Sequence, residues 1–209
     1  MRNLGAGIFA IVFLCLAPAA LAQGAMTAEE AEALAALEAE LPGTLMNNPM
    51  APGWTTHGAA ASTKVVKAPE VPGGLAYEVR VKQANRNPWD VSVTAALTSG
   101  VSSGDAVLIA FWARATKPAD ETGGAEMQVR VQQSAAPYTG IAEAQVTVQP
   151  KWQLHYVKGI APASYDTGKV SLAFNTGKHK QTVQFGQVYV MNLGPGVRLD
   201  SLPSAPEDL

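Results

Sequence analysis

The chain has very little cysteine. Among its 209 residues the only one is Cys15, which lies in an apolar stretch over residues 4–16 near the N-terminus. This stretch follows a positive charge and precedes the small-residue site Ala20-Leu21-Ala22, a pattern typical of a secretory signal peptide cleaved before Gln23. We therefore predict a signal peptide over residues 1–22 and a periplasmic or secreted protein. Its mature chain then has no disulfide and no thiolate metal site.

A membrane anchor and a lipid anchor both fit this N-terminus less well. Pro18 interrupts the apolar run, which is shorter than the roughly 20 residues that span a bilayer. Leu14 is bulky at the position where a lipoprotein signal has a small residue before the modified cysteine. We expect no membrane attachment after cleavage.

The chain also lacks an excess of positive charge. It has 15 Lys and Arg against 17 Asp and Glu, and cleavage would remove one more cation, Arg2. Without a basic excess, nothing predicts binding to nucleic acid or to an anionic membrane. Histidine is scarce too, because only His57, His155 and His179 are present and their spacing matches no metal site. We expect no cofactor.

Sequence motifs of catalysis are missing. The chain has no Gly-x-Ser-x-Gly elbow, no His-Glu-x-x-His and no phosphate loop. A glycosidase needs two carboxylates about 5 to 10 Å apart, and the acidic residues of the strand-forming region show no such pairing in sequence. These are Glu78, Asp90, Asp105, Glu126, Glu143 and Asp166. We expect a protein that is not an enzyme, although two carboxylates from distant segments could still meet in space.

One helix is predicted, close to the N-terminus. Thr27-Ala28-Glu29-Glu30 has the spacing of a capping box, and Ala, Leu and Glu dominate until Pro42-Gly43 ends the pattern. This predicts a helical leader over residues 23–43. Its single stripe of leucines would either pack on the rest of the protein or leave the leader as a spacer.

From residue 62 onward the helical period disappears, and short β-type runs alternate with Gly, Pro, Asn and Asp. No second helix-length apolar stripe exists, which excludes an alternating βαβ fold. We predict an all-β jelly-roll β-sandwich of two antiparallel sheets over residues 44–203, preceded by the short helix and followed by a tail over 204–209. The predicted strands are Thr63–Lys67, Leu75–Lys82, Trp89–Leu97, Asp105–Ala115, Ala125–Ser134, Ala142–Gln149, Gln153–Gly159, Lys169–Asn175 and Thr182–Asn192.

Alternation within two of these runs assigns their faces. In the run from Asp105, the core face carries Val107, Ile109, Phe111 and Ala113, and the other face carries Leu108, Ala110, Trp112 and Arg114. In the run from Ala125, the core face carries Met127, Val129 and Val131, and the other carries Gln128, Arg130 and Gln132. If these neighbouring runs pair, their outward residues share one polar face. Aromatic rings and planar polar groups suit a sugar ligand.

Three stretches taken together resemble carbohydrate-binding modules of families 4 and 9. They are Asn87-Pro88-Trp89-Asp90-Val91, the run from Gly104 to Arg114, and Gln181-Thr182-Val183-Gln184-Phe185-Gly186. The resemblance covers residues 44–203 and implies a galactose-binding-like jelly roll of the kind appended to xylanases and cellulases. It also implies a polysaccharide or oligosaccharide ligand and a partner enzyme that processes it.

A structural calcium is common in that class, held by an acidic residue near the last strand. This chain has Gln187-Val188-Tyr189-Val190 there, so the sequence departs from the calcium pattern and leaves calcium binding open. Trp152 matches a packed tryptophan of the family, so we expect it to be structural. For His155 we expect a surface position.

The candidate carbohydrate-binding residues are Trp89, Trp112, Arg114, Gln128, Arg130, Gln132 and Tyr138. Each has a plainer interpretation. Trp89 could pack at a sheet edge, the leader or the loop around Trp54 could cover Trp112, and the Arg and Gln residues could form an ordinary solvated face. Tyr138 lies in a turn, where binding residues are common.

Two other functions are consistent with the same residues. The sandwich could be an interaction module that docks a glycan-active enzyme, with Trp112 at the interface and the helical leader taking part. It could also be a glycan-active enzyme, such as a lyase or an esterase, on a jelly-roll scaffold.

Overall fold

The computed structural model describes residues 41–118 and 123–208, together with five isolated positions between 28 and 39. The predicted signal peptide lies outside the described residues, as do 13 of the 21 residues of the predicted helical leader, so both stay predictions. Within the described residues, no helix combines the length and the apolar character needed to span a bilayer.

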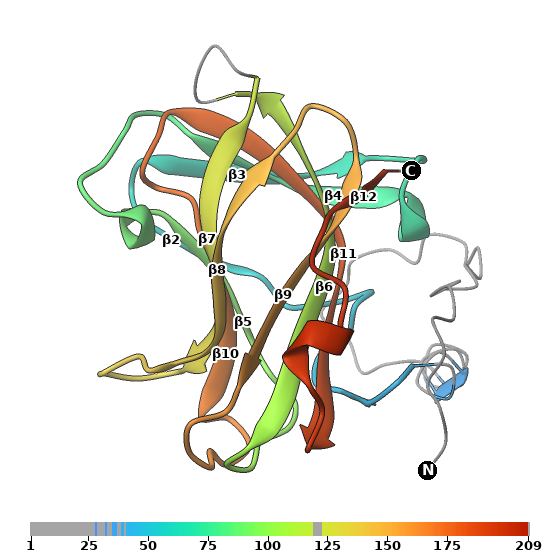
Figure 1. Cartoon of the computed structure of the whole chain (residues 1–209). Coiled ribbons are helices and arrows are strands. Elements are labelled where there is room, and N and C mark those ends of the chain that lie inside the picture. Colours follow the sequence, from blue (N-terminus) through green and yellow to red (C-terminus); the bar gives the residue numbers. More distant parts are fainter. Residues whose placement is uncertain are drawn as a thin grey trace.

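The described residues form two antiparallel sheets, as predicted. Sheet A has the order β12-β9-β6-β11-β4-β3, with β1 paired to β11, and sheet B has the order β2-β5-β10-β7-β8. Figure 1 shows the two sheets face to face, with sheet B on the left and β6, β9 and β11 of sheet A on the right. The strands are β1 (Thr44–Leu45), β2 (Thr55–His57), β3 (Ala61–Lys67), β4 (Leu75–Val81), β5 (Ser92–Ala96), β6 (Asp105–Lys117), β7 (Ala125–Gln133), β8 (Gly140–Val148), β9 (Gln153–Ile160), β10 (Val170–Asn175), β11 (Gln181–Pro195) and β12 (Glu207–Asp208).

All nine predicted strands are present, with shifted ends. One of the two largest shifts is at Trp89, which was predicted to open a strand but lies in the 3₁₀ turn η2 (Pro88–Asp90), while β5 begins at Ser92. Asn87 and Asp90 form a capping box around this turn, and Pro88 is its first residue, so the local chemistry ends the extended backbone before the strand begins. Two further 3₁₀ turns are η1 (Pro72–Gly74) and η3 (Leu199–Ser201).

The main core lies between the sheets and includes a cluster of aromatic rings. Phe174 of β10 contacts the rings of Trp54, Phe111 and Phe185 at centroid distances of 5.7, 5.2 and 4.5 Å. Phe111, Phe174 and Phe185 have no exposed surface. The predicted inward faces of β6 and β7 are confirmed, because Val107, Ile109, Phe111, Ala113, Met127, Val129 and Val131 all belong to this core.

The outward face of sheet A is also buried. The outer cluster, as we call it, comprises Leu45, Ala68, Val71, Ala76, Leu108, Ala110, Trp112, Trp152, Leu154, Tyr189 and Met191. This explains why β6 is apolar in both phases whereas β7 alternates: both faces of β6 are covered, but only one face of β7 is.

Candidate functional site

The outward face of sheet B is polar and partly open. Strand register aligns its residues in rows that cross β5, β10, β7 and β8. One row is Ser92, Asn175, Gln128 and Gln145, the next is Thr94, Ala173, Arg130 and Glu143, and the third is Ala96, Ser171, Gln132 and Gly140. We call these residues the sheet B face.

Side-chain size differs between the strands of this face. The central strand β10 presents only short side chains, of which Ala173 and Asn175 are buried, whereas β7 presents Gln128, Arg130 and Gln132, which are partly exposed. A chain-like ligand that followed β10 would therefore have long hydrogen-bonding side chains along one flank.

Three contacts hold the polar side chains of this face in place. Asn175 Nδ2 donates to Gln128 Oε1 at 3.0 Å. Arg130 Nε lies 2.8 Å from a carboxylate oxygen of Glu143, and Arg130 Nη2 donates to the main-chain oxygen of Tyr138 at 3.0 Å. Fixed planar groups lose little further entropy when they bind a ligand, which favours recognition of hydroxyl groups.

Tyr138 stands at one end of the face, in the turn that joins β7 to β8. Its backbone has φ 55°, the left-handed region that a tyrosine rarely adopts. Its ring is 50% exposed although the main-chain oxygen is bound to Arg130. A strained backbone that holds an aromatic ring in solvent is typical of a binding position.

Trp89 stands at the opposite end, in η2, with 57% of its surface exposed. The turn after β10 holds η2 in place, because Gly177 N donates to Pro88 O at 2.7 Å and Thr176 N donates to Val91 O at 2.9 Å. A side chain on Gly177 would come within 2.6 Å of the Val91 nitrogen, so only glycine permits this approach.

The two exposed aromatic residues thus lie beyond the two ends of one polar strip. The turn between β7 and β8 and the turn η2 both extend from the sheet B side of the molecule (Figure 1). From Ser171 to Asn175 the strip measures roughly 13 Å at the usual rise of a strand. Both rings offer an apolar face on which the C–H surface of a sugar ring can stack.

The structure separates Trp112 and Arg114 from the other candidate residues. β6 pairs with β9 and β11 in sheet A, whereas β7 pairs with β8 and β10 in sheet B. The expectation that the outward residues of these two runs share one face is therefore wrong. The reason is that the connection after β6 crosses from one sheet to the other instead of forming a hairpin.

Trp112 is only 4% exposed and belongs to the outer cluster. The loop around Trp54 does not cover it, since Trp54 packs on Phe174 and Tyr77 in the main core. Gly186 allows close packing here, because a side chain on it would meet the Trp112 Cβ at 2.9 Å. The packing interpretation of Trp112 is thus the one that the structure supports.

Arg114 belongs to a polar row across sheet A. Its Nε donates to Gln184 Oε1 at 2.8 Å, and Gln184 Nε2 donates to Glu78 Oε2 at 2.7 Å. Lys64 pairs with the same carboxylate at 3.3 Å. The guanidinium carbon also lies 4.7 Å from the ring centre of Trp152, which is buried as predicted. These contacts give Arg114 a structural role.

Sequence reasoning missed several residues of the sheet B face. Asn175 and Ser171 of β10 and Thr94 of β5 alternate with the buried residues Phe174, Leu172 and Val93 of the same strands. Alternation within these two predicted strands could therefore have identified them as outward-facing. The sequence could not show that β10 lies between β5 and β7, because β10 is separated from β7 by two intervening strands and from β5 by four.

His155 is buried and not at the surface as expected. It faces the main core from β9, is 2% exposed and stacks on Phe111 at 5.4 Å. It also lines a groove of about 360 Å³ between β8 and β9. Burial lowers the pKa of His155 from 6.5 to about 4, so its ring is neutral at physiological pH.

The requirements of a metal site built from side chains are not met by the described residues. Among the described residues, no three His, Cys, Asp or Glu side chains come together in a way that could hold a metal ion. The described residues therefore do not fit a side-chain-built calcium site of the kind that the family resemblance raises.

Comparisons with known proteins confirm the predicted resemblance at the level of the fold. No protein-family model and no curated protein matches the sequence. A solved CBM4 structure matches with a TM-score of 0.52 and 18% identity, over 74% of this chain and 90% of that one. The second N-terminal cellulose-binding domain of β-1,4-glucanase C from Cellulomonas fimi gives 0.52 and 17%, over 75% and 94%.

A third match involves a larger protein. An arabinose-bound GH51 α-L-arabinofuranosidase matches with a TM-score of 0.52 and 15% identity, over 71% of this chain but only 24% of that one. The same sandwich therefore occurs as a separate domain and as part of an enzyme chain. At these identities the similarity establishes the fold of this chain.

Proposed function

We propose that this chain is an exported, non-catalytic carbohydrate-binding protein, located in the periplasm or secreted, whose ligand lies along the sheet B face. The observation that carries the proposal is the placement of the exposed aromatic residues. Among the described residues, four large apolar ones are exposed: the two aromatic ones, Trp89 and Tyr138, flank this polar face, while Val65 and Ile160 belong to sheet A.

The polar residues between the two rings fit a polysaccharide. Gln128 and Gln132 are partly exposed and offer amide donors and acceptors to sugar hydroxyls, while the buried Asn175 holds Gln128 in place. Family-level resemblance supports the same class of ligand, since two of the matched structures are described as a CBM4 and a cellulose-binding domain.

A non-catalytic role is supported by the state of the acidic residues on and beside this face. Glu143 pairs with Arg130, and Glu126 pairs with His179 at 3.3 Å. The side chains of Glu143 and Glu126 are 51% and 57% exposed, so both carboxylates lack the burial that keeps a general acid protonated. Processing of the ligand would then fall to a separate enzyme, which is the partner that we propose.

Binding to soluble and insoluble polysaccharides tests the proposal. The mature protein should bind at least one glycan in pull-down and calorimetry, and Trp89→Ala and Tyr138→Ala should each weaken binding roughly 10-fold, as expected for the loss of one stacked aromatic ring. Val65→Ala is the matched control, because it removes exposed apolar surface from sheet A and should leave affinity unchanged.

Three outcomes count against the proposal. Glycan binding that survives both aromatic substitutions would move the site away from the sheet B face. Release of reducing ends or other products from a polysaccharide would show an enzyme. Absence of binding to every glycan tested would favour a protein-interaction module.

A further inference from the structure

A group of cations surrounds the Trp89 end of the sheet B face. Arg86 lies three residues before Trp89, and Lys178 and Lys180 lie in the turn between β10 and β11. All three side chains are exposed. We call these three residues the basic rim.

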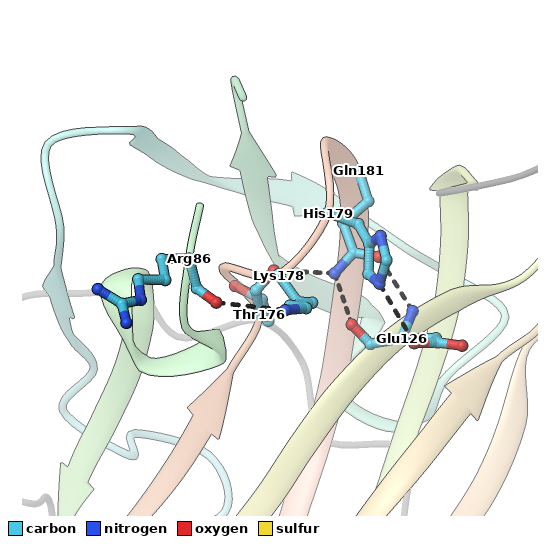
Figure 2. Close-up of polar contacts among 6 residues, drawn as sticks. All are labelled: Arg86, Glu126, Thr176, Lys178, His179 and Gln181. Carbon is cyan, nitrogen blue, oxygen red and sulfur yellow. Dashed lines mark hydrogen bonds and ion pairs between the residues drawn. The ribbon is translucent and has the colours of Figure 1, made fainter. Parts of the chain in front are cut away.

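The basic rim is attached directly to the turn that carries Trp89. Lys178 Nζ donates to the main-chain oxygen of Arg86 at 3.2 Å. Asn85 N donates to Gly177 O at 3.0 Å, and Gly177 in turn donates to Pro88 O. Figure 2 shows Lys178 between Arg86 on one side and the Glu126, His179 and Gln181 group on the other. The two turns therefore form one unit.

A buried network fixes the position of this unit. Gln181 is 2% exposed, and its Nε2 donates to Glu126 O at 2.6 Å and to Thr176 O at 2.9 Å. Its Oε1 accepts from Glu126 N at 3.0 Å. These contacts tie the turn to the first residues of β7, so the cations are held at the edge of the face before any ligand arrives.

The charge of the basic rim is not neutralised by nearby acids. Within the described residues, none of its three cations takes part in an ion pair. Asp90 is the nearest acid in sequence, but its carboxylate accepts from Asn87 N and Asn87 Nδ2 inside its own turn. Glu126 is paired with His179. The three cations exceed the two carboxylates of Asp90 and Glu126, so this end of the face has a small positive excess on a chain whose formal net charge is −2.

We infer that the glycan carries negative charge and that the basic rim binds its carboxylate or sulfate groups while a sugar ring stacks on Trp89. This inference rests on the proposed function and adds the chemical class of the ligand to it. A nucleic acid is the other class of polyanion, and a single-stranded oligonucleotide is included in the test below to distinguish it.

Pairs of polysaccharides that share a backbone and differ in charge test the inference. Carboxymethyl cellulose is compared with hydroxyethyl cellulose, polygalacturonate with highly methyl-esterified pectin, and dextran sulfate with dextran. At 50 mM NaCl we expect the charged member of at least one pair to bind several-fold more tightly, and the preference to fall at 500 mM NaCl because salt screens exposed charges. The carboxylate and sulfate pairs distinguish the two anions.

A double variant assigns the preference to the basic rim. Arg86→Gln with Lys178→Gln should reduce binding of the charged glycan roughly 3- to 10-fold, as two exposed ion pairs would, and leave the neutral member unchanged. The matched control is Lys64→Gln with Lys67→Gln, which removes two exposed cations from β3 in sheet A and should have no effect.

Each outcome decides between the two proposals. Equal binding of charged and neutral glycans, lost in Trp89→Ala, overturns the charge inference and leaves the carbohydrate function in place. Loss of binding in the Lys64 and Lys67 control, or equal binding of a single-stranded oligonucleotide, would show a nonspecific charge effect and also overturns it. If no glycan of either kind binds, the proposed function itself fails.

Discussion

Acid should destabilise this protein through one buried histidine. His155 faces the core from β9 and stacks on Phe111, and its Nε2 atom has no hydrogen-bond partner among the described residues. Its pKa is lowered from 6.5 to about 4 because burial penalises the charged ring. The unfolded chain exposes the same ring to water, where its pKa returns to the ordinary value.

The sign and size of the effect follow from this difference. Between pH 6.5 and about 4 the unfolded state binds a proton that the folded state does not, so folding stability falls as the pH falls through this window. Above pH 6.5 both states are neutral and the full stability is present. A shift from 6.5 to about 4 corresponds to about 3 kcal/mol of unfolding free energy lost between neutral pH and pH 4.

Urea unfolding at pH 7, 5.5 and 4 measures this loss directly, with His155→Leu as the comparison. Leucine is apolar, is similar in volume to histidine and has no ring to protonate. The variant should therefore lose about 2 to 3 kcal/mol less unfolding free energy than the wild type between pH 7 and 4. Other titrating groups contribute to both proteins and cancel in the difference. Equal losses in the two proteins would refute the assignment of the acid sensitivity to His155.

Three further predictions concern the core and the Trp89 end of the site. Phe174→Ala should cost about 3 to 5 kcal/mol of unfolding free energy in urea, because it leaves a cavity at the centre of the aromatic cluster. A cost below 1 kcal/mol would contradict the central position of Phe174. Gln181→Ala should cost about 2 to 4 kcal/mol by the same measurement, since it removes the partner of the buried main-chain oxygen of Thr176 and of two part-buried main-chain groups of Glu126. An unchanged midpoint would show that water replaces Gln181. Gly177→Ala should weaken glycan binding in calorimetry, because the added carbon would come within 2.6 Å of the Val91 backbone nitrogen and displace η2 with Trp89. Unchanged affinity in a folded variant would count against the role of η2.

The candidate site was only partly predictable from the sequence. Gln128, Arg130 and Gln132 share one face because alternation within a strand is a local property, and the structure places them together on sheet B as the pattern predicts. Tyr138 was proposed from its position in a turn, and the structure places it in that turn. Trp89 was proposed as well, but it lies in a 3₁₀ turn and not in a strand.

The remaining errors concern contacts between distant segments. Trp112 is on the predicted face of β6, but β1, the segment between β3 and η1, and β9 supply residues of the outer cluster that buries it. None of these segments is marked by a pattern linked to β6. The short strands β1, β2 and β12 were missed because two or three residues cannot show alternation. β12 lies in the predicted tail and pairs with β9.

The sequence by itself determined the all-β class, the approximate bounds of nine strands and the inward phase of β6 and β7, because each depends on the backbone period within one short segment. Only the tertiary structure decided which strands are neighbours. That decision set Gln128 beside Asn175, moved Arg114 to the opposite sheet and joined the turn of Lys178 to the turn of Trp89. Pairing between strands depends on how the whole chain buries its apolar faces, which no single segment encodes.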